Sequence, residues 1–148
     1  MNCFCTLFIN SRHNADLPVS MFSYRSISQF DFTDNESPER LAMRSRLEMK
    51  GILQSADRPR YWWNINTDGK VSGSDIDEHI AWLVARVRPG RLLNELSAAG
   101  YGYFFSVFWP GNGTGGGPLI TLRTVEMLAS HRAELGVGFY YDDASGAG

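Results

Sequence analysis

The sequence predicts a two-layer α+β domain, in which a mostly antiparallel or mixed sheet of about four to five strands carries about three helices on one face. Three observations predict this class. Short segments rich in aromatic and branched residues alternate with segments of helical period. The 148 residues suffice for one domain that buries a core without disulfides or metals. Apolar residues make up 43% and charged residues 20% of the chain, a composition typical of globular proteins.

The first elements are short and end in turns. Residues 3–9 are aromatic and branched over strand length, which predicts a buried strand. Residues 17–27 leave two alternatives open, a short helix that begins at Pro18 or an irregular loop. Residues 28–33 alternate polar with apolar side chains and therefore predict a strand with one solvent-exposed face.

A helix is predicted next, with Ser37 as its N-cap and Pro38 in its first position. It extends to Leu53 with an imperfect apolar stripe and several arginines. Because glutamates interleave with these arginines, a solvated surface is favoured over a basic face for nucleic acid.

Residues 61–66 have strand composition, and residues 67–70 turn the chain. Since strand side chains alternate, Trp62 and Trp63 must lie on opposite faces. One of the two is expected in the core and the other at a surface, and the sequence does not decide which.

Two helices are expected after this turn. Ser74, followed by acidic residues, caps the first helix, whose apolar stripe reaches Val87. On its flank, Trp82 lies four residues before Arg86, a spacing that favours packing of the indole beneath the arginine. Residues 91–99 form the second helix, with Leu92, Leu93 and Leu96 facing inward and Gly100 as its C-cap.

The C-terminal part is predicted to contain strand, loop, helix and strand. Residues 101–109 are aromatic at nearly every position, and Gly102 inside them marks a bulge or a close backbone approach. A loop with five glycines, 110–117, precedes a helix over 121–135. Gly136 is expected to cap that helix before a closing strand over 137–141.

Charge and cysteine content restrict the function. The net charge of −2 provides no global attraction for nucleic acid or anionic membranes. No segment has the roughly 20 apolar residues that span a bilayer, and the N-terminus lacks secretory features, so a cytoplasmic protein is expected. Cys3 and Cys5 are expected to be buried thiols, and no histidine spacing around them indicates a metal site. We expect no cofactor.

Several segments together resemble the bacterial domain of unknown function numbered 4279. The resemblance covers roughly residues 60–143 and is most specific in the loop Trp109-Pro-Gly-Asn-Gly-Thr-Gly-Gly and in the terminal pattern Leu135-Gly-x-x-x-Tyr-x-Asp142. It implies a small α+β domain. Residues 10–58 depart from the family's compact opening and are interpreted as an elaborated N-terminal part of one domain over residues 1–143, and the small residues of 144–148 predict a flexible tail. It implies no reaction and no catalytic residues, and by association it suggests an immunity-type or inhibitor role.

The chain has four tryptophans, six tyrosines and nine phenylalanines, more than a two-layer domain of this size easily buries. This favours a non-enzymatic protein-binding module, because Trp, Tyr and Arg dominate protein interfaces. Such a module would act by direct contact with a bacterial toxin or defence component, and a homodimer formed through a sheet edge stays open. The residues expected to contact the partner are Trp62, Trp63, Trp82, Tyr103, Trp109, Asn112, Gly113 and Thr114.

Two other functions stay open. A glycine-rich loop between a strand and a helix is the order that phosphate-binding loops use, so 110–117 could hold a nucleotide or another small ligand. The loop lacks the Gly-Lys-Ser/Thr ending of nucleoside-triphosphate sites. An enzyme would need a nucleophile and a base that converge, and His79 beside Glu78, the adjacent acids Asp142 and Asp143, and the two cysteines are candidates in residue type only.

Overall fold

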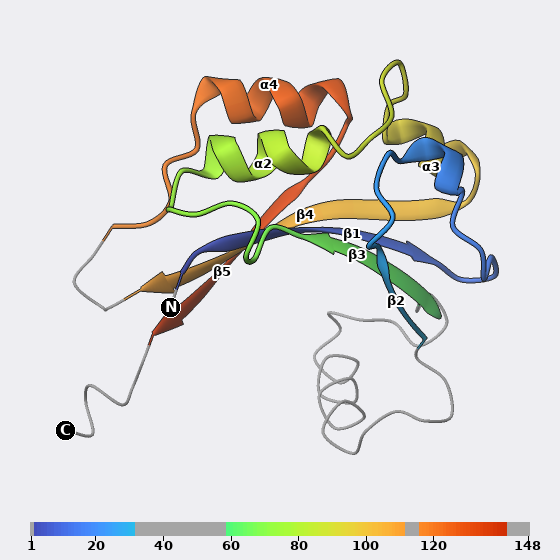
Figure 1. The fold of residues 1–148 in the computed structure, drawn as a ribbon, viewed down its shortest axis with the longest axis horizontal. Coiled ribbons are helices and arrows are strands. Elements are labelled where there is room, and N and C mark those ends of the chain that lie inside the picture. Colours follow the sequence, from blue (N-terminus) through green and yellow to red (C-terminus); the bar gives the residue numbers. More distant parts are fainter. Residues whose placement is uncertain (1, 32–58, 112–115, 142–148) are drawn as a thin grey trace.

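The computed structural model describes residues 2–31, 59–111 and 116–141. It is an α+β fold with one open five-stranded sheet, and the helices lie on one side of it (Figure 1). The predicted fold class is therefore confirmed. In sequence order the elements are β1 (Phe4–Ser11), the 3-10 turn η1 (Val19–Met21), β2 (Ser28–Asp31), β3 (Tyr61–Asn66), α2 (Ile76–Val84), α3 (Asn94–Ala98), β4 (Tyr101–Gly111), α4 (Leu122–Ser130) and β5 (Leu135–Tyr141).

The strand order is β2-β3-β1-β4-β5, with β1 in the middle. Neighbouring strands are antiparallel except β4 and β5, which run parallel. Parallel neighbours need a crossover connection, and α4 provides it. The sheet is thus mixed, and its outer strands within the described residues are β2 and β5.

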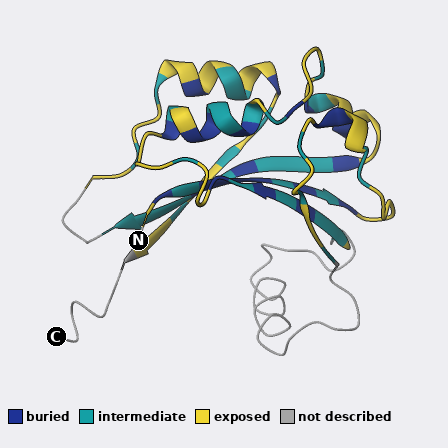
Figure 2. Cartoon of the chain, viewed as in Figure 1, coloured by how far each residue is buried: buried dark blue, intermediate teal, exposed yellow. Residues whose placement is uncertain are grey.

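The core lies between the sheet and the helices, where alternate residues of each strand are buried (Figure 2). Leu7 on β1 faces Phe105 on β4 and Ile65 on β3, and all three side chains are at most 1% exposed. Ile80 and Leu83 of α2 belong to the same buried cluster. Burial of these side chains is the main source of the domain's stability.

The first long helix begins and ends differently from its prediction. Asp75 is the N-cap of α2, and its carboxylate accepts a hydrogen bond from the Asp77 N–H at 3.0 Å. The helix ends at Val84, because Val87 has left it to form an isolated β-bridge with Phe22. The predicted cap at the preceding serine and the predicted extension to residue 87 are both wrong.

The last helix is shorter than predicted, and Gly136 does not cap it. Helix α4 ends at Ser130, and Arg132 then adopts a left-handed backbone with φ of 50°. The N–H of Ala133 donates to the Leu128 carbonyl at 2.9 Å, which is the hydrogen bond of a Schellman ending. An arginine takes the place usually held by glycine, so Gly136 is free to lie inside β5.

Helix α3 covers only the second half of the predicted segment 91–99, and Leu92 is 43% exposed while Leu93 and Leu96 are buried. The ambiguous segment 17–27 contains the single turn η1. The helix predicted to extend to Leu53 and the tail 144–148 lie outside the described residues. None of the helices in the described part of the chain is long and apolar enough to cross a membrane.

Candidate functional site

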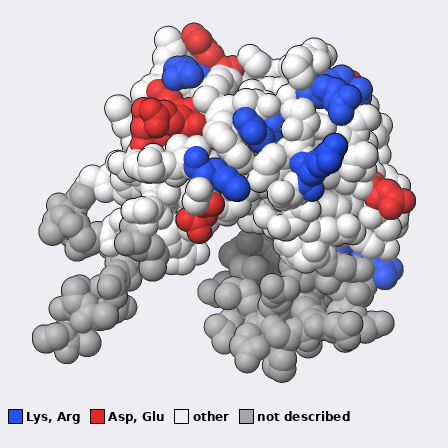
Figure 3. Space-filling model, viewed as in Figure 1, with Lys and Arg blue, Asp and Glu red and all other residues white. Residues whose placement is uncertain are grey.

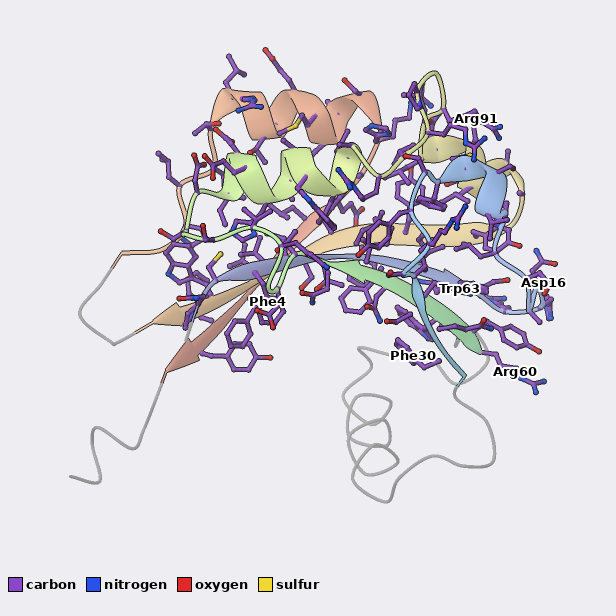
Figure 4. All side chains as sticks on the ribbon, in the orientation of Figure 1. Phe4, Asp16, Phe30, Arg60, Trp63 and Arg91 are labelled. Atoms are coloured by element: carbon purple, nitrogen blue, oxygen red, sulfur yellow. The ribbon has the colours of Figure 1, made fainter. Side chains whose placement is uncertain are left out.

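The face of the sheet opposite the helices carries a row of aromatic side chains, which we call the aromatic face. Register places these residues on one side, because directly opposed residues share a face. No helix of the described part of the chain lies on this side (Figure 1). Figure 4 shows two of them, Phe4 and Phe30, pointing away from the helices. The aromatic face consists of Phe4, Phe8, Phe30, Trp62, Phe104, Phe108 and Tyr140.

Three rings near β5 form a continuous stack across three strands. The Phe4 and Phe108 ring centroids are 4.7 Å apart with an interplanar angle of 7°. The Phe108 and Tyr140 centroids are 4.4 Å apart at 28°. Phe4 and Phe108 are half-buried, whereas Tyr140 is 57% exposed. Gly138 leaves room for this stack, because a Cβ at position 138 would lie only 3.3 Å from Cε2 of the Tyr140 ring.

A second group of rings lies further along β1. Phe8 and Phe104 stack at 5.2 Å, and Trp62 packs edge-on against both, at 6.1 and 6.2 Å. Phe30 of the outer strand stacks on Trp62 at 6.1 Å. Between the two groups lies the polar pair Thr6 and Asn66, whose side chains are hydrogen-bonded at 2.8 Å. Aromatic stacking therefore extends over the sheet with a narrow polar strip inside it.

The aromatic face has no charged residue at any of its described strand positions. Besides aromatic side chains, these positions hold only small or neutral polar residues: Thr6, Asn10, Ser28, Asn64, Asn66, Gly102, Ser106, Pro110, Gly136 and Gly138. The charged side chains visible in Figure 3 lie mainly over the helices. Apolar rings with neutral hydrogen-bonding groups beside them are suited to an uncharged partner surface.

The two adjacent tryptophans are separated as alternation predicts. Trp63 is 3% exposed and packs at 5.9 Å from the ring of Tyr101 in the core. Trp62 lies on the aromatic face. Burial removes Trp63 from any surface contact in this conformation, so Trp62 alone of the pair lies on the candidate surface.

The remaining predicted contact residues do not join Trp62. The Arg86 guanidinium lies 4.4 Å from the Trp82 ring, on the flank of α2 as expected. The Tyr103 hydroxyl donates to the carbonyls of His131 and Arg132, at 2.8 and 3.0 Å, and so fixes the end of α4. Both residues therefore stabilise the helical layer, on the other side of the sheet from Trp62.

Trp109 is half-buried against the core and lines a small cavity of about 260 Å³ beside Cys3. It pairs with Phe139, on the helix side of the sheet. Asn112, Gly113 and Thr114 lie outside the described residues. The five predicted contact residues that the structure describes thus do not form one surface.

Of the residues on the aromatic face, only Trp62 is among the predicted contact residues. Phe4, Phe8, Phe104 and Phe108 belong to no motif, and Tyr140 stands only in the terminal Leu135-Gly-x-x-x-Tyr-x-Asp142 pattern, but all five have even numbers within their strands. Period-two alternation of aromatic residues in β1 and β4 could have identified them, given the knowledge that helices cover the odd-numbered face.

A carboxylate occupies the region where a phosphate-binding loop would hold its anion. Thr121 is the N-cap of α4, and its hydroxyl donates to both carboxylate oxygens of Asp77, at 2.6 and 2.7 Å. The Thr124 hydroxyl also donates to Asp77. These hydroxyls lower the pKa of Asp77. A negative side chain already interacts with the N-terminal end of α4, which disfavours a bound phosphate there.

His79 and the two cysteines, named above as catalytic candidates, are buried in the structure. His79 is fully buried, with Nδ1 2.6 Å from the Thr67 hydroxyl and Nε2 3.0 Å from the Gly73 carbonyl, so both ring nitrogens are engaged. Burial, with a smaller effect of Cys3, raises the pKa of Cys5 to about 12, which disfavours the reactive thiolate. Among the described residues no group of His, Cys, Asp and Glu has the arrangement of a metal site.

The buried histidine near α3 is likewise engaged. His131 accepts a hydrogen bond from the Leu93 N–H at its Nδ1, at 3.0 Å. Burial lowers the pKa of His131, which favours the neutral ring that this contact requires. The ring thereby connects α4 to the start of α3.

One larger hollow lies on the helix side, beside β2. It has a volume of about 710 Å³, and Trp63, Phe22 and Ile27 are among its apolar lining residues. Arg25 and Arg88 are on its rim, and Arg88 is hydrogen-bonded to the Phe22 carbonyl at 3.4 Å. The hollow has room for a small ligand.

Comparison of the chain with protein families, with curated proteins and with solved structures gives no match. These comparisons therefore assign no function to the chain.

Proposed function

We propose that this protein is a non-enzymatic protein-binding module whose partner docks on the aromatic face. The observation that carries this proposal is the three-ring stack of Phe4, Phe108 and Tyr140 on a side of the sheet without described helices. Aromatic side chains give large contact areas and lose little conformational entropy when a partner orders them. Rows of such rings are therefore effective anchors for another protein.

Charge favours a protein over a nucleic acid as the partner. Proteins that bind single-stranded nucleic acid combine stacking rings with Lys and Arg that neutralise the phosphates. The described strand positions of the aromatic face have rings but no cations. A protein surface with an apolar centre needs no such charges, and Asn64 and Ser106 can provide polar contacts beside the rings.

The more specific proposal is an immunity-type protein or a phage-encoded inhibitor that binds a bacterial toxin or defence component. It is supported only by the resemblance to the family of unknown function. Cytoplasmic action belongs to the same proposal, and the free thiols of Cys3 and Cys5 are consistent with a reducing compartment. The alternative, a nucleotide or small-ligand protein using loop 110–117, has weaker support because Asp77 lies at the N-terminus of α4.

Capture from host lysate with matched variants tests the proposal. Phe4→Ser and Phe104→Ser each remove one ring of the aromatic face from a different group. Leu122→Ser is the control, because it makes the same kind of change at a 71% exposed position of α4. Circular dichroism and thermal unfolding verify that each variant folds.

We expect one stoichiometric partner that both ring variants lose and the control retains, and binding that is insensitive to salt. Retention of the partner by both ring variants, or its loss from all three proteins, would contradict docking on the aromatic face. Stabilisation by millimolar nucleotide without any captured protein would favour the ligand-binding alternative.

A further inference from the structure

Strand β5 is an outer strand whose sequence does nothing to prevent pairing. It runs from Leu135 to Tyr141 as LGVGFYY, without a charge or a proline. Natural sheets protect such edges with lysine, proline, bulges or short length. Among the described residues, no strand pairs with the outer side of β5. Three of its side chains are unusually exposed for their size: Val137 at 36%, Phe139 at 50% and Tyr140 at 57%.

The hydrogen bonds to β4 determine which backbone groups are available. The Glu134 carbonyl accepts from the Phe105 N–H at 2.9 Å, so even-numbered groups of this segment point toward β4. In an extended strand the N–H and C=O of successive residues point in opposite directions. The groups of the odd-numbered residues, including Val137 and Phe139, therefore point outward from the sheet.

The strand is also complementary to itself. An antiparallel copy centred on Gly138 places Val137 opposite Phe139 of the second copy, which is a favourable pair of a branched and an aromatic residue on the helix side. On the other side it places Tyr140 opposite Gly136 of the second copy. In this second pair an aromatic residue faces a glycine, as in sheets where an aromatic ring covers a cross-strand glycine.

We propose that two copies of this chain dimerise by antiparallel pairing of β5 with β5 about a twofold axis at Gly138. The outward direction of the odd-numbered backbone groups agrees with this register. Gly138 directs its own backbone groups toward β4, so it forms a non-hydrogen-bonded pair on the axis, while Val137 and Phe139 exchange outward hydrogen bonds with the second copy. Residues 135–141 carry no charge, so the paired strands themselves oppose no like charges, although each copy has a net charge of −2.

Disulfide trapping tests both the dimer and its register. Residues in a non-hydrogen-bonded antiparallel pair have Cα atoms about 4.5 Å apart, which is within disulfide range. We expect Gly138→Cys to give a covalent dimer under mild oxidation. Gly136→Cys is the matched control, because its two copies are four residues apart along the strand, about 13 Å. A mixture of Gly136→Cys and Tyr140→Cys is expected to crosslink, since these residues face each other. Neither variant alone should do so.

A second measurement does not depend on the added thiols. Sedimentation equilibrium of the full chain is expected to show a dimer that Val137→Pro converts to monomer, because proline removes an outward N–H and leaves the bonds to β4 in place. Phe139→Lys provides the same test if the proline variant fails to fold.

Three results would overturn the proposal: a wild-type chain that is monomeric at several concentrations, crosslinking of Gly136→Cys alone as fast as Gly138→Cys, or a dimer that both Val137→Pro and Phe139→Lys retain. A monomer would leave the edge available for a strand of another protein. None of these readouts uses a foreign partner, so they are independent of the proposed docking on the aromatic face.

Discussion

Replacement of Thr67 by valine tests the buried polar cluster that joins β1, the β3–α2 turn and α2. The Thr67 hydroxyl accepts from the Cys5 N–H at 2.8 Å and contacts His79 Nδ1 at 2.6 Å. His79 Nε2 lies 3.0 Å from the Gly73 carbonyl, which can only accept. In the neutral ring Nε2 therefore carries the proton, and Nδ1 accepts from the threonine hydroxyl.

The expected loss of stability follows from what valine cannot do. Valine fills nearly the same volume, but it leaves the Cys5 N–H and His79 Nδ1 without a partner in a fully buried place. Each such orphaned group costs about 1–3 kcal/mol, so Thr67→Val should lower the free energy of unfolding by about 2–6 kcal/mol. Thr67→Ser keeps the hydroxyl and removes one methyl group, which costs about 1 kcal/mol.

Urea unfolding followed by tryptophan fluorescence and circular dichroism measures both variants. We expect the valine variant to be clearly less stable than the serine variant, with an unchanged dependence of the unfolding free energy on urea concentration. If valine cost no more than serine, the hydroxyl would not be an essential partner of His79. That result would also return His79 to consideration as a functional residue.

Three further predictions concern single sites. Folding favours the ionised form of Asp77, because the pKa of its carboxyl is lowered in the folded state. The stability that this carboxylate contributes is therefore fully present above its ordinary pKa near 3.8 and is lost as pH falls through the lower pKa of the folded state. In acid-range urea titrations, the difference in unfolding free energy between wild type and Asp77→Asn should shrink below about pH 4. Cys3 and Cys5 are buried with raised pKa values, so neither should react with an aromatic disulfide reagent at pH 8 until urea unfolds the chain, and rapid labelling without urea would contradict their burial. A Cβ at Gly102 would lie 2.6 Å from Asn10 Oδ1, so Gly102→Ala should cost about 1 kcal/mol, and a double-mutant cycle with Asn10→Ala should remove most of that cost.

The sequence identified elements better than it identified their ends. Strand β3 matches its prediction at both bounds, because turn residues flank a run of aromatic and branched side chains. Helix α4 was overextended, because Leu135 continues the apolar pattern although it belongs to β5. A local pattern cannot separate the two elements when the left-handed residue between them is Arg132 rather than glycine.

The predicted contact residues failed to converge for a different reason. Alternation fixed that Trp62 and Trp63 lie on opposite faces, but only the tertiary fold decides which face the helices cover. Once that face is known, the odd-numbered Tyr103 and Trp109 belong to the covered side, and the even-numbered Phe104 and Phe108 to the open one. The same information explains Gly102, for which the sequence predicted a bulge or a close backbone approach and which lies against the Asn10 side chain.

The aromatic face and the β5 edge would act together if both proposals hold. Antiparallel pairing places directly opposed residues on the same face, so a dimer about Gly138 would have both sets of helices on one side and both aromatic faces on the other. The two stacks of Phe4, Phe108 and Tyr140 would then flank the axis. A partner with two equivalent sites would bind both stacks, and the second contact would benefit from a high effective concentration. Val137→Pro should therefore weaken capture of such a partner, although residue 137 lies on the opposite side of the sheet. A partner with a single site would be insensitive to this change.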